Sequence, residues 1–230
     1  MLIGPQNLTA NVNHVRSRIR HAALAVARDP ESVTLVAVSK GKSAEKVRQA
    51  ATAGVTDFGE NYLQEALAKI DQLGGLEVHW HYIGQIQSNK TRAIAQRFAW
   101  VHSLDRMDIA RRLSEQRPFH APPLQVCLQV ALIAEPAKGG IEPGSLPALA
   151  AAVAQLPRLH LRGLMCIPPP QPDVSAERAV FARLRELKDQ LNANGLKLDT
   201  LSMGMSADFE SAIAAGATMV RIGTALFGAR

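Results

Sequence analysis

Short, almost continuous apolar runs recur along the chain and alternate with segments of helical periodicity. Runs of this kind, rich in β-branched residues, are typical of strands that are buried on both faces of a parallel sheet. The first is Val33-Thr34-Leu35-Val36-Ala37-Val38-Ser39-Lys40. Eight such strands are expected, at residues 33–40, 57–60, 78–84, 100–104, 124–132, 161–167, 200–203 and 219–223.

The segments between these runs have the spacing of amphipathic helices. They are residues 44–53, 62–73, 90–97, 107–115, 146–155, 175–193 and 206–215, and an extra helix at about 7–27 precedes the first strand. Gly54, Gly195 and Gly216 stand where three of these helices would end. Eight strands alternating with helices in 230 residues predict an α/β fold, a single (β/α)8 TIM-type barrel.

We expect one domain over residues 1–230, with the N-terminal helix in 1–30, the barrel in 33–228 and no added C-terminal β-domain. Hydrophobic residues make up 47% and charged residues 20%, which is typical of a folded globular chain. No apolar run is long enough for a membrane span, and the N-terminus lacks the apolar core of a signal peptide. Cys127 and Cys166 alone make no disulfide framework, so a cytoplasmic protein is expected.

The net charge of +6 raises the question of a nucleic-acid partner. The basic residues are scattered, however, and aromatic residues are only 4% of the chain, too few for base-stacking platforms. A basic, solvated surface without a nucleic-acid or membrane partner is therefore the favoured interpretation.

Unusual polar residues gather where the expected strands end, the face on which barrel enzymes carry their sites. Lys40 closes the first strand and shares the inward parity of Val36 and Val38. Desolvation disfavours the charged form of an amine, so a lysine at this place can attack a carbonyl and form an imine. A solvated cation at the strand end is the alternative.

Arg221 is expected to point into the barrel with Met219 and Gly223, because Val220 and Ile222 take the outward parity. An inward arginine needs an anionic or acceptor partner. An anionic ligand and a structural ion pair, for example with Glu60, are both open on the sequence alone.

Small and hydroxyl-bearing residues follow the seventh and eighth strands, at Ser202-Met203-Gly204-Met205-Ser206 and Gly223-Thr224. In barrels of this type these two loops commonly bind a phosphate through backbone N–H groups. Ser206 is alternatively the N-cap of a helix with Asp208 in its first turn, which needs no ligand.

His79 and His81 share one face of the third strand, but no carboxylate or cysteine stands with them at a metal-ligand spacing. Satisfied or exposed histidines are favoured, and no metal site is expected. Cys127 and Cys166 are expected to pack as small apolar residues.

Several motifs together resemble those of a known family. They are Val-Ser-Lys at 38–40, Phe58-Gly59-Glu60-Asn61-Tyr62, His81-Tyr82-Ile83-Gly84, Arg162-Gly163-Leu164-Met165, and the dense final block from Ser202-Met203-Gly204-Met205-Ser206 through Val220-Arg221-Ile222-Gly223 to Phe227-Gly228. The chain resembles the pyridoxal phosphate (PLP) homeostasis proteins, PLP-binding proteins that are similar to the N-terminal domain of alanine racemase.

The resemblance implies a barrel that carries PLP as an imine on Lys40, and Asn61, which closes the second strand on the same rim, is a further candidate cofactor residue. It implies that Ser202, Met203, Gly223 and Thr224 contribute to the phosphate site and that Arg221 lies by the pyridine nitrogen. The chain departs from the family at Gly41-Lys42-Ser43, where Thr-Lys-Pro is common, and at Ala131, where members often carry Asn. The second departure removes one polar group from the rim.

The family resemblance implies a monomer that buffers PLP or delivers it, with apo PLP-dependent enzymes as partners, and no catalytic residues. A PLP-dependent amino-acid racemase is the alternative. Racemisation needs a base on each face of the substrate, whereas the chain ends at Arg230 and its two tyrosines, Tyr62 and Tyr82, lie in the barrel portion. A Schiff-base aldolase acting on a phosphosugar fits the generic site but not the specific motifs.

Overall fold

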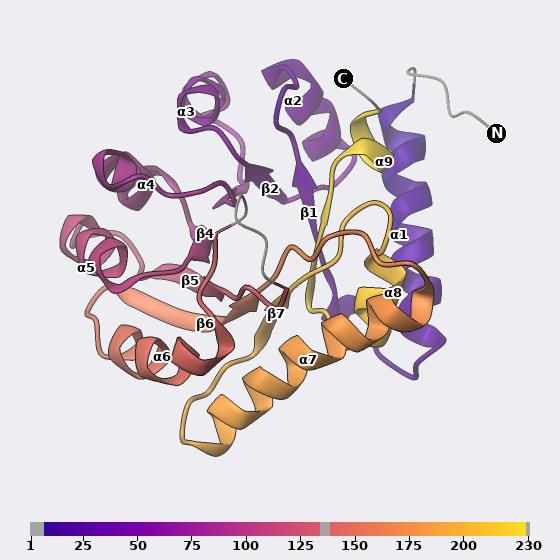
Figure 1. The fold of residues 1–230 in the computed structure, drawn as a ribbon. Coiled ribbons are helices and arrows are strands. Elements are labelled where there is room, and N and C mark those ends of the chain that lie inside the picture. The colour runs from indigo at the N-terminus through magenta and orange to yellow at the C-terminus, as the bar shows by residue number, and fades with distance from the viewer. Residues whose placement is uncertain (1–6, 134–138, 229–230) are drawn as a thin grey trace.

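Eight parallel strands close into one barrel in chain order, with β8 hydrogen-bonded back to β1 (Figure 1). The computed structural model describes residues 7–133 and 139–228. The strands are β1 Thr34–Val38, β2 Asp57–Glu60, β3 His79–Tyr82, β4 Trp100–Leu104, β5 Leu124–Gln129, β6 Leu159–Met165, β7 Thr200–Ser202 and β8 Met219–Ile222. The predicted TIM-type α/β barrel is thus confirmed.

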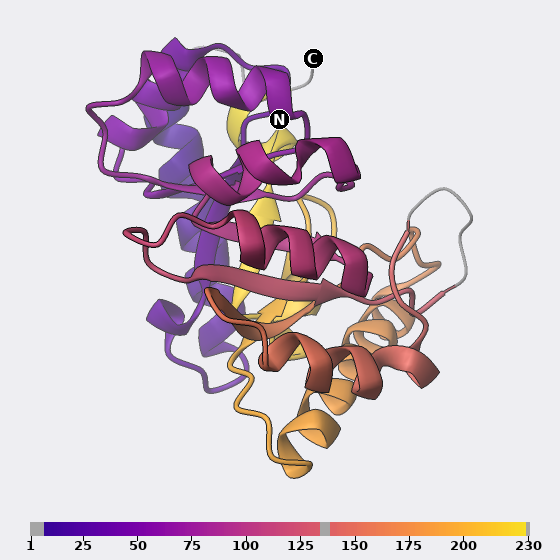
Figure 2. The same cartoon turned by 90° about the vertical axis from the view of Figure 1, so that its left-hand side faces the viewer.

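Helices surround this barrel on the outside, and Figure 2 shows α3 to α6 following one another in chain order across one of its faces. The helices are α1 Leu8–Leu24, α2 Ala44–Thr52, α3 Leu63–Gln72, α4 Thr91–Arg97, α5 Met107–Gln116, α6 Leu146–Ala154, α7 Val174–Ala193, α8 Phe209–Ala214 and α9 Thr224–Phe227. Within the described ranges, none of them has the length and apolar character needed to cross a bilayer.

The extra helix α1 has clear local causes. Asn7 caps it by accepting a hydrogen bond from the backbone N–H of Ala10 at 3.0 Å. Val12, Val15, Ile19 and Ala23 lie on one buried face at helical spacing. Figure 1 shows that this helix runs beside α8 and α9, with which it is in contact.

Two apolar layers form the core. Val36, Trp100, Cys127, Met165 and Met219 fill the inside of the barrel, and a larger layer lies between the strands and the helices. The inward position of Val36 and Met219 confirms the parity from which Lys40 and Arg221 were expected to face the barrel mouth. Cys127 and Cys166 are free, buried thiols, as predicted.

Two local expectations are wrong. The first strand was expected to reach Lys40, but β1 ends at Val38 and the backbone N–H of Lys42 turns back to the Ser39 carbonyl at 3.0 Å. Ser206 does not cap a helix that carries Asp208, because α8 begins only at Phe209. Asp208 instead accepts a hydrogen bond from the Met205 N–H at 2.6 Å, which closes a tight turn before the helix.

Candidate functional site

A cavity of about 330 Å³ opens where the carboxyl ends of β1, β2 and β8 meet. This is the face on which barrels of this class carry their sites, and the volume is sufficient for a small cofactor. The lining residues are Val38, Lys40, Asn61, Ile83, Ile167, Met205, Ser206, Ala207, Arg221, Gly223 and Thr224.

Five of the seven predicted cofactor residues line this cavity, namely Lys40, Asn61, Arg221, Gly223 and Thr224. Ser202 and Met203 are fully buried and are not among the lining residues. Met205, Ser206 and Ala207, which follow them in the same loop, reach the cavity instead. A motif at a strand end does not by itself show which of its residues line the cavity and which are buried beneath the cavity lining.

Arg221 lies at the floor of the cavity and is held from two sides. Its Nη1 donates to Ser202 Oγ at 2.7 Å and its Nη2 donates to the Cys166 carbonyl at 2.9 Å. Its side chain is buried, and this burial lowers its pKa. Within the described residues, no carboxylate lies within salt-bridge distance of Arg221. A buried guanidinium without a paired carboxylate is well suited to an acceptor or anionic ligand.

The ion pair considered between Arg221 and Glu60 is wrong, because Glu60 pairs with Lys69. Lys69 Nζ lies 2.6 Å from Glu60 Oε1, 2.6 Å from Glu65 Oε1 and 2.6 Å from the Ser39 carbonyl. Burial raises the pKa of Glu60, against the opposing effect of Lys69 and Ser39. Lys69 was not among the residues predicted from the sequence, although the i,i+4 spacing of Glu65 and Lys69 on one helix was a usable signal.

This buried cluster fixes the turn that carries Lys40. The Ser39 hydroxyl donates to Glu60 Oε1 at 2.5 Å, and Glu65 accepts from the backbone N–H of Gly41 at 2.6 Å. The residues on both sides of Lys40 are therefore tied to β2 and α3. As a result, the backbone at Lys40 is held in place, and its half-buried side chain lies at the cavity wall.

Asn61 presents an unsatisfied acceptor at the same wall. Its Oδ1 is buried and has no hydrogen-bond partner among the described residues. Gly84 packs so closely on Asn61 that a Cβ there would lie 2.1 Å from the Asn61 carbonyl oxygen. Since buried polar atoms are almost always paired, this acceptor suits the hydroxyl of a ligand.

Another part of the cavity wall is built from small and hydroxyl-bearing residues. Ser206, Ala207, Gly223 and Thr224 line it, and the two loops are linked by a long hydrogen bond of 3.4 Å from the Ala225 N–H to Ser206 Oγ. Small residues let a ligand come close to backbone N–H groups, and hydroxyls add donors. Lys40 and Arg221 are the only ionisable residues among the described lining residues. The cavity as a whole suits a phosphorylated aldehyde.

For His79 and His81, the structure agrees with the favoured interpretation that these histidines are exposed or hydrogen-bonded. His79 is exposed, whereas His81 is buried inside the barrel and hydrogen-bonded on both ring nitrogens. One of its partners is His102, which is buried and does not line the cavity. No group of potential metal ligands is found among the residues that the structure describes.

Comparisons with known proteins agree with this fold and show the family. Residues 3–230 match the family described as alanine racemase, N-terminal domain. A pyridoxal phosphate homeostasis protein of Pseudomonas aeruginosa is 61% identical over 223 residues, covering 97% of this chain and 96% of that protein. The Escherichia coli protein of the same name is 48% identical over 227 residues, covering 97% of each. The structure of PipY of Synechococcus elongatus with PLP bound superposes with a TM-score of 0.85 at 36% identity, covering 96% of this chain and 100% of that one.

The chain is therefore a barrel protein of the alanine racemase N-terminal domain family. Since its relatives match over nearly their whole length, the assignment can be made narrower. Within that family, the chain belongs with the pyridoxal phosphate homeostasis proteins.

Proposed function

We propose that this protein binds PLP in the cavity between Lys40 and Thr224 and takes part in intracellular PLP homeostasis as a cytoplasmic, monomeric carrier. One observation carries the proposal. A primary amine at Lys40, a buried guanidinium at Arg221 and a wall of small and hydroxyl-bearing residues share one cavity of about 330 Å³. This donor set matches an aldehyde, a ring nitrogen and a phosphate. The relatives named for PLP homeostasis and PLP-bound PipY support it.

In this proposal each side chain has one role. The Lys40 amine forms an imine with the PLP aldehyde, and Asn61 Oδ1 accepts a hydrogen bond from the ligand. Arg221 lies by the pyridine nitrogen, while Gly223, Thr224 and Ser206 hold the phosphate. Ser202 and Met203 act indirectly, because they are buried and do not line the cavity. Ser202 Oγ accepts a hydrogen bond from Arg221, and the Met203 N–H donates to the Met219 carbonyl at 3.1 Å, which anchors the loop.

The carrier role is favoured over a racemase for two reasons. Lys40 and Arg221 are the only ionisable side chains among the described lining residues, and an arginine cannot serve as the second base that racemisation needs on the other face of the substrate. Arg221 can only donate a hydrogen bond, so it leaves the pyridine nitrogen unprotonated, and an unprotonated ring is a weaker electron sink. The bound PLP is then available for transfer to apo PLP-dependent enzymes.

Borohydride reduction of the PLP-loaded protein tests the imine. Lys40→Ala is expected to abolish the reduced adduct and the visible absorption of the bound aldehyde. Lys42→Ala is the matched control, because Lys42 donates to the Gly228 carbonyl at 3.1 Å and does not line the cavity. An adduct that survives in Lys40→Ala and disappears in Lys42→Ala would overturn the assignment.

A second assay tests carriage against catalysis. The PLP-loaded protein is incubated with L-alanine, and chiral inversion and deuterium exchange at Cα are followed. We expect negligible turnover, together with recovery of activity when an apo PLP-dependent enzyme is added as acceptor. Racemisation at about 1 per second or faster, a typical enzymatic rate, would favour the enzyme.

A further inference from the structure

A continuous chain of hydrogen-bonded side chains runs through the barrel interior below the cavity. Arg221 Nη1 donates to Ser202 Oγ at 2.7 Å, and Ser202 Oγ lies 2.7 Å from His102 Nδ1. His102 Nε2 lies 2.9 Å from His81 Nδ1, and His81 Nε2 lies 2.9 Å from Asp57 Oδ1. The chain therefore connects the cavity floor with the start of β2, through β8, β7, β4 and β3 in turn.

The protonation states of its members give this chain one direction. Burial lowers the pKa of His81 and that of His102, so both rings are neutral. Burial works to raise the pKa of Asp57, but hydrogen bonds from His81 and Thr56 outweigh it and leave that pKa lowered, so Asp57 is a carboxylate. A carboxylate and a guanidinium can each play only one part, the first accepting and the second donating.

Only one arrangement of protons lets every member of the chain donate to the next. His81 carries its proton on Nε2 and donates to Asp57, so its Nδ1 accepts from His102. His102 then also carries its proton on Nε2, and its Nδ1 accepts from the Ser202 hydroxyl. The Ser202 oxygen in turn accepts from Arg221. Every donor points from the cavity toward Asp57.

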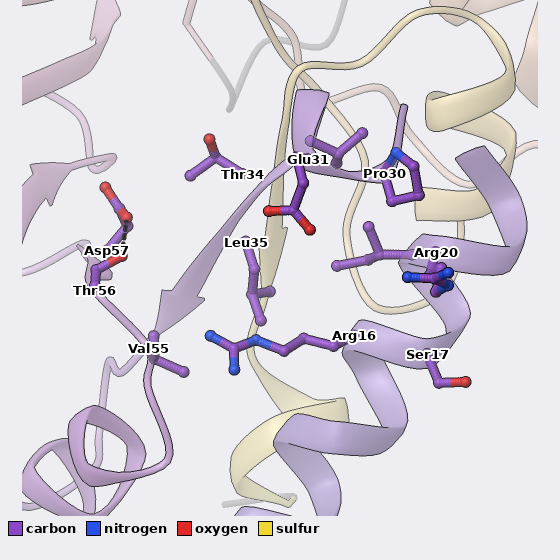
Figure 3. A pocket seen from close by; sticks show the side chains of 12 residues that line it. Arg16, Ser17, Arg20, Pro30, Glu31, Thr34, Leu35, Val55, Thr56 and Asp57 are labelled. Atoms are coloured by element: carbon purple, nitrogen blue, oxygen red, sulfur yellow. Dashed lines mark hydrogen bonds between the residues drawn. The ribbon is translucent and has the colours of Figure 1, made fainter. Parts of the chain in front are cut away.

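Packing holds the two rings in this alignment. Trp100 stacks on His81 with ring centroids 5.6 Å apart and planes 4° from parallel, and it also contacts His102. His81, His102 and Ser202 are fully buried. Asp57 is the outer end of the chain: it lines a separate cleft of about 480 Å³ between β2 and α1, where Figure 3 shows it across from Arg16 and Arg20.

We propose that Asp57, His81 and His102 are positioning residues for Arg221: their one-way hydrogen-bond chain fixes the Ser202 lone pair that orients the guanidinium toward the ring nitrogen of the ligand. The chain ends at the Asp57 carboxylate, so that Arg221 is hydrogen-bonded to a neutral hydroxyl and not to a carboxylate. A carboxylate in contact with Arg221 would compete with the ligand for its N–H groups, whereas a chain that ends at Asp57 does not. This inference rests on the proposed function for the ligand's identity but not for the chain itself.

The first test needs no ligand and no substitution. Two-bond ¹H–¹⁵N spectra of the histidine-labelled protein without PLP report the tautomer of each ring. We expect both His81 and His102 to be neutral with the proton on Nε2. An Nδ1–H tautomer or an imidazolium at either position contradicts the one-way chain.

The second test uses ¹⁵N-labelled PLP, whose ring-nitrogen resonance reports its hydrogen bond. His102→Phe removes both ring nitrogens and is expected to shift this resonance and to weaken PLP binding about tenfold, the effect of one lost hydrogen bond to a charged group. His102→Gln is expected to restore both readouts, because its amide N–H can donate to His81 and its oxygen can accept from Ser202. Equal effects of Phe and Gln would overturn a positioning role.

His79→Gln is the matched control. His79 contacts the same Asp57 oxygen at 3.3 Å, but its side chain is 65% exposed and is not part of the chain. The ring-nitrogen resonance and the PLP affinity should stay unchanged, and a shift as large as that of His102→Phe counts against the proposal. If labelled PLP does not bind the wild-type protein at all, the proposed function fails, and the tautomer spectra alone then decide whether the one-way chain exists.

Discussion

Replacing Lys69 by methionine should destabilise the protein by about 3–5 kcal/mol at pH 7, because it leaves a buried carboxylate without its cation. Glu60 is 0% exposed, and Lys69 Nζ is its only cationic partner among the described residues. The variant can avoid burying the charge by protonating Glu60. Starting from the ordinary pKa of 4.5, this costs about 3.4 kcal/mol at pH 7. The lost hydrogen bond to the Ser39 carbonyl adds about 1–2 kcal/mol, and methionine recovers part of that by packing.

The pH dependence identifies the cause. In the variant the folded pKa of Glu60 lies above the unfolded value, so the penalty vanishes as the pH falls toward the unfolded value. By the same arithmetic it drops to about 1.4 kcal/mol at pH 5.5. Since burial already raises the pKa of Glu60 in the wild type, both proteins share part of this pH dependence, and the deficit relative to wild type should shrink by at most about 2 kcal/mol between pH 7 and pH 5.5.

Urea unfolding followed by the fluorescence of the buried Trp80 and Trp100 measures these differences. The double variant Glu60→Gln/Lys69→Met is the control, since it removes the charge together with its partner. We expect it to be more stable than Lys69→Met at pH 7 and to show little of the pH dependence. A loss below about 1 kcal/mol in Lys69→Met, or a deficit that is independent of pH, would refute the reasoning.

Three further predictions follow from other parts of the barrel. His81 and His102 have lowered pKa values in the folded protein, so the free energy of unfolding should fall as the pH drops below about 6.5, by up to about 1.4 kcal/mol per pH unit for each ring. Urea unfolding measures this decrease. The Glu60→Gln variant is used because it removes the opposite contribution of the Glu60 carboxyl. Gly84→Ala places a Cβ 2.1 Å from the Asn61 carbonyl oxygen and should cost more than about 3 kcal/mol, whereas Gly75→Ala, with nothing within 4 Å, should be near neutral in the same assay. Burial raises the pKa of Cys127 and of Cys166 to about 12, so both thiols should react with an aromatic disulfide only after unfolding, and rapid reaction of the native protein at pH 8 would contradict their burial.

The inward residues of single strands could be predicted from sequence, because side-chain direction alternates strictly along a strand. This placed Lys40 at the barrel mouth and Arg221 inside the barrel, each from its own neighbours in the chain. The same rule cannot say which inward residues of different strands meet. Contact between His81 and His102 depends on the offset of β3 against β4, which the sequence of neither strand contains.

Short elements were missed for a related reason. The helix α9 has four residues, too few for a periodic pattern to show. The start of α8 was placed too early because Ser206 is a good capping residue by composition, while the turn that Asp208 closes with Met205 decides the structure. Lys69 escaped notice because a lysine on a helix is usually exposed.

The cavity lies at the seam of the barrel, where β8 pairs with β1, and this position has a consequence for biosynthesis. β1 and β8 pair directly, with Val36 opposite Arg221, so the two halves of the site come from strands that are almost two hundred residues apart in the chain. Pairing strands that are so far apart in the chain carries the entropic cost of closing a long loop. Lys40 therefore leaves the ribosome long before Arg221, Gly223 and Thr224, and a growing chain has no complete binding site. A ligand that bridges the seam favours the closed ring over any open form. PLP supply would then stabilise the closed barrel, and cells that lack PLP should accumulate more of this protein with β1 and β8 unpaired.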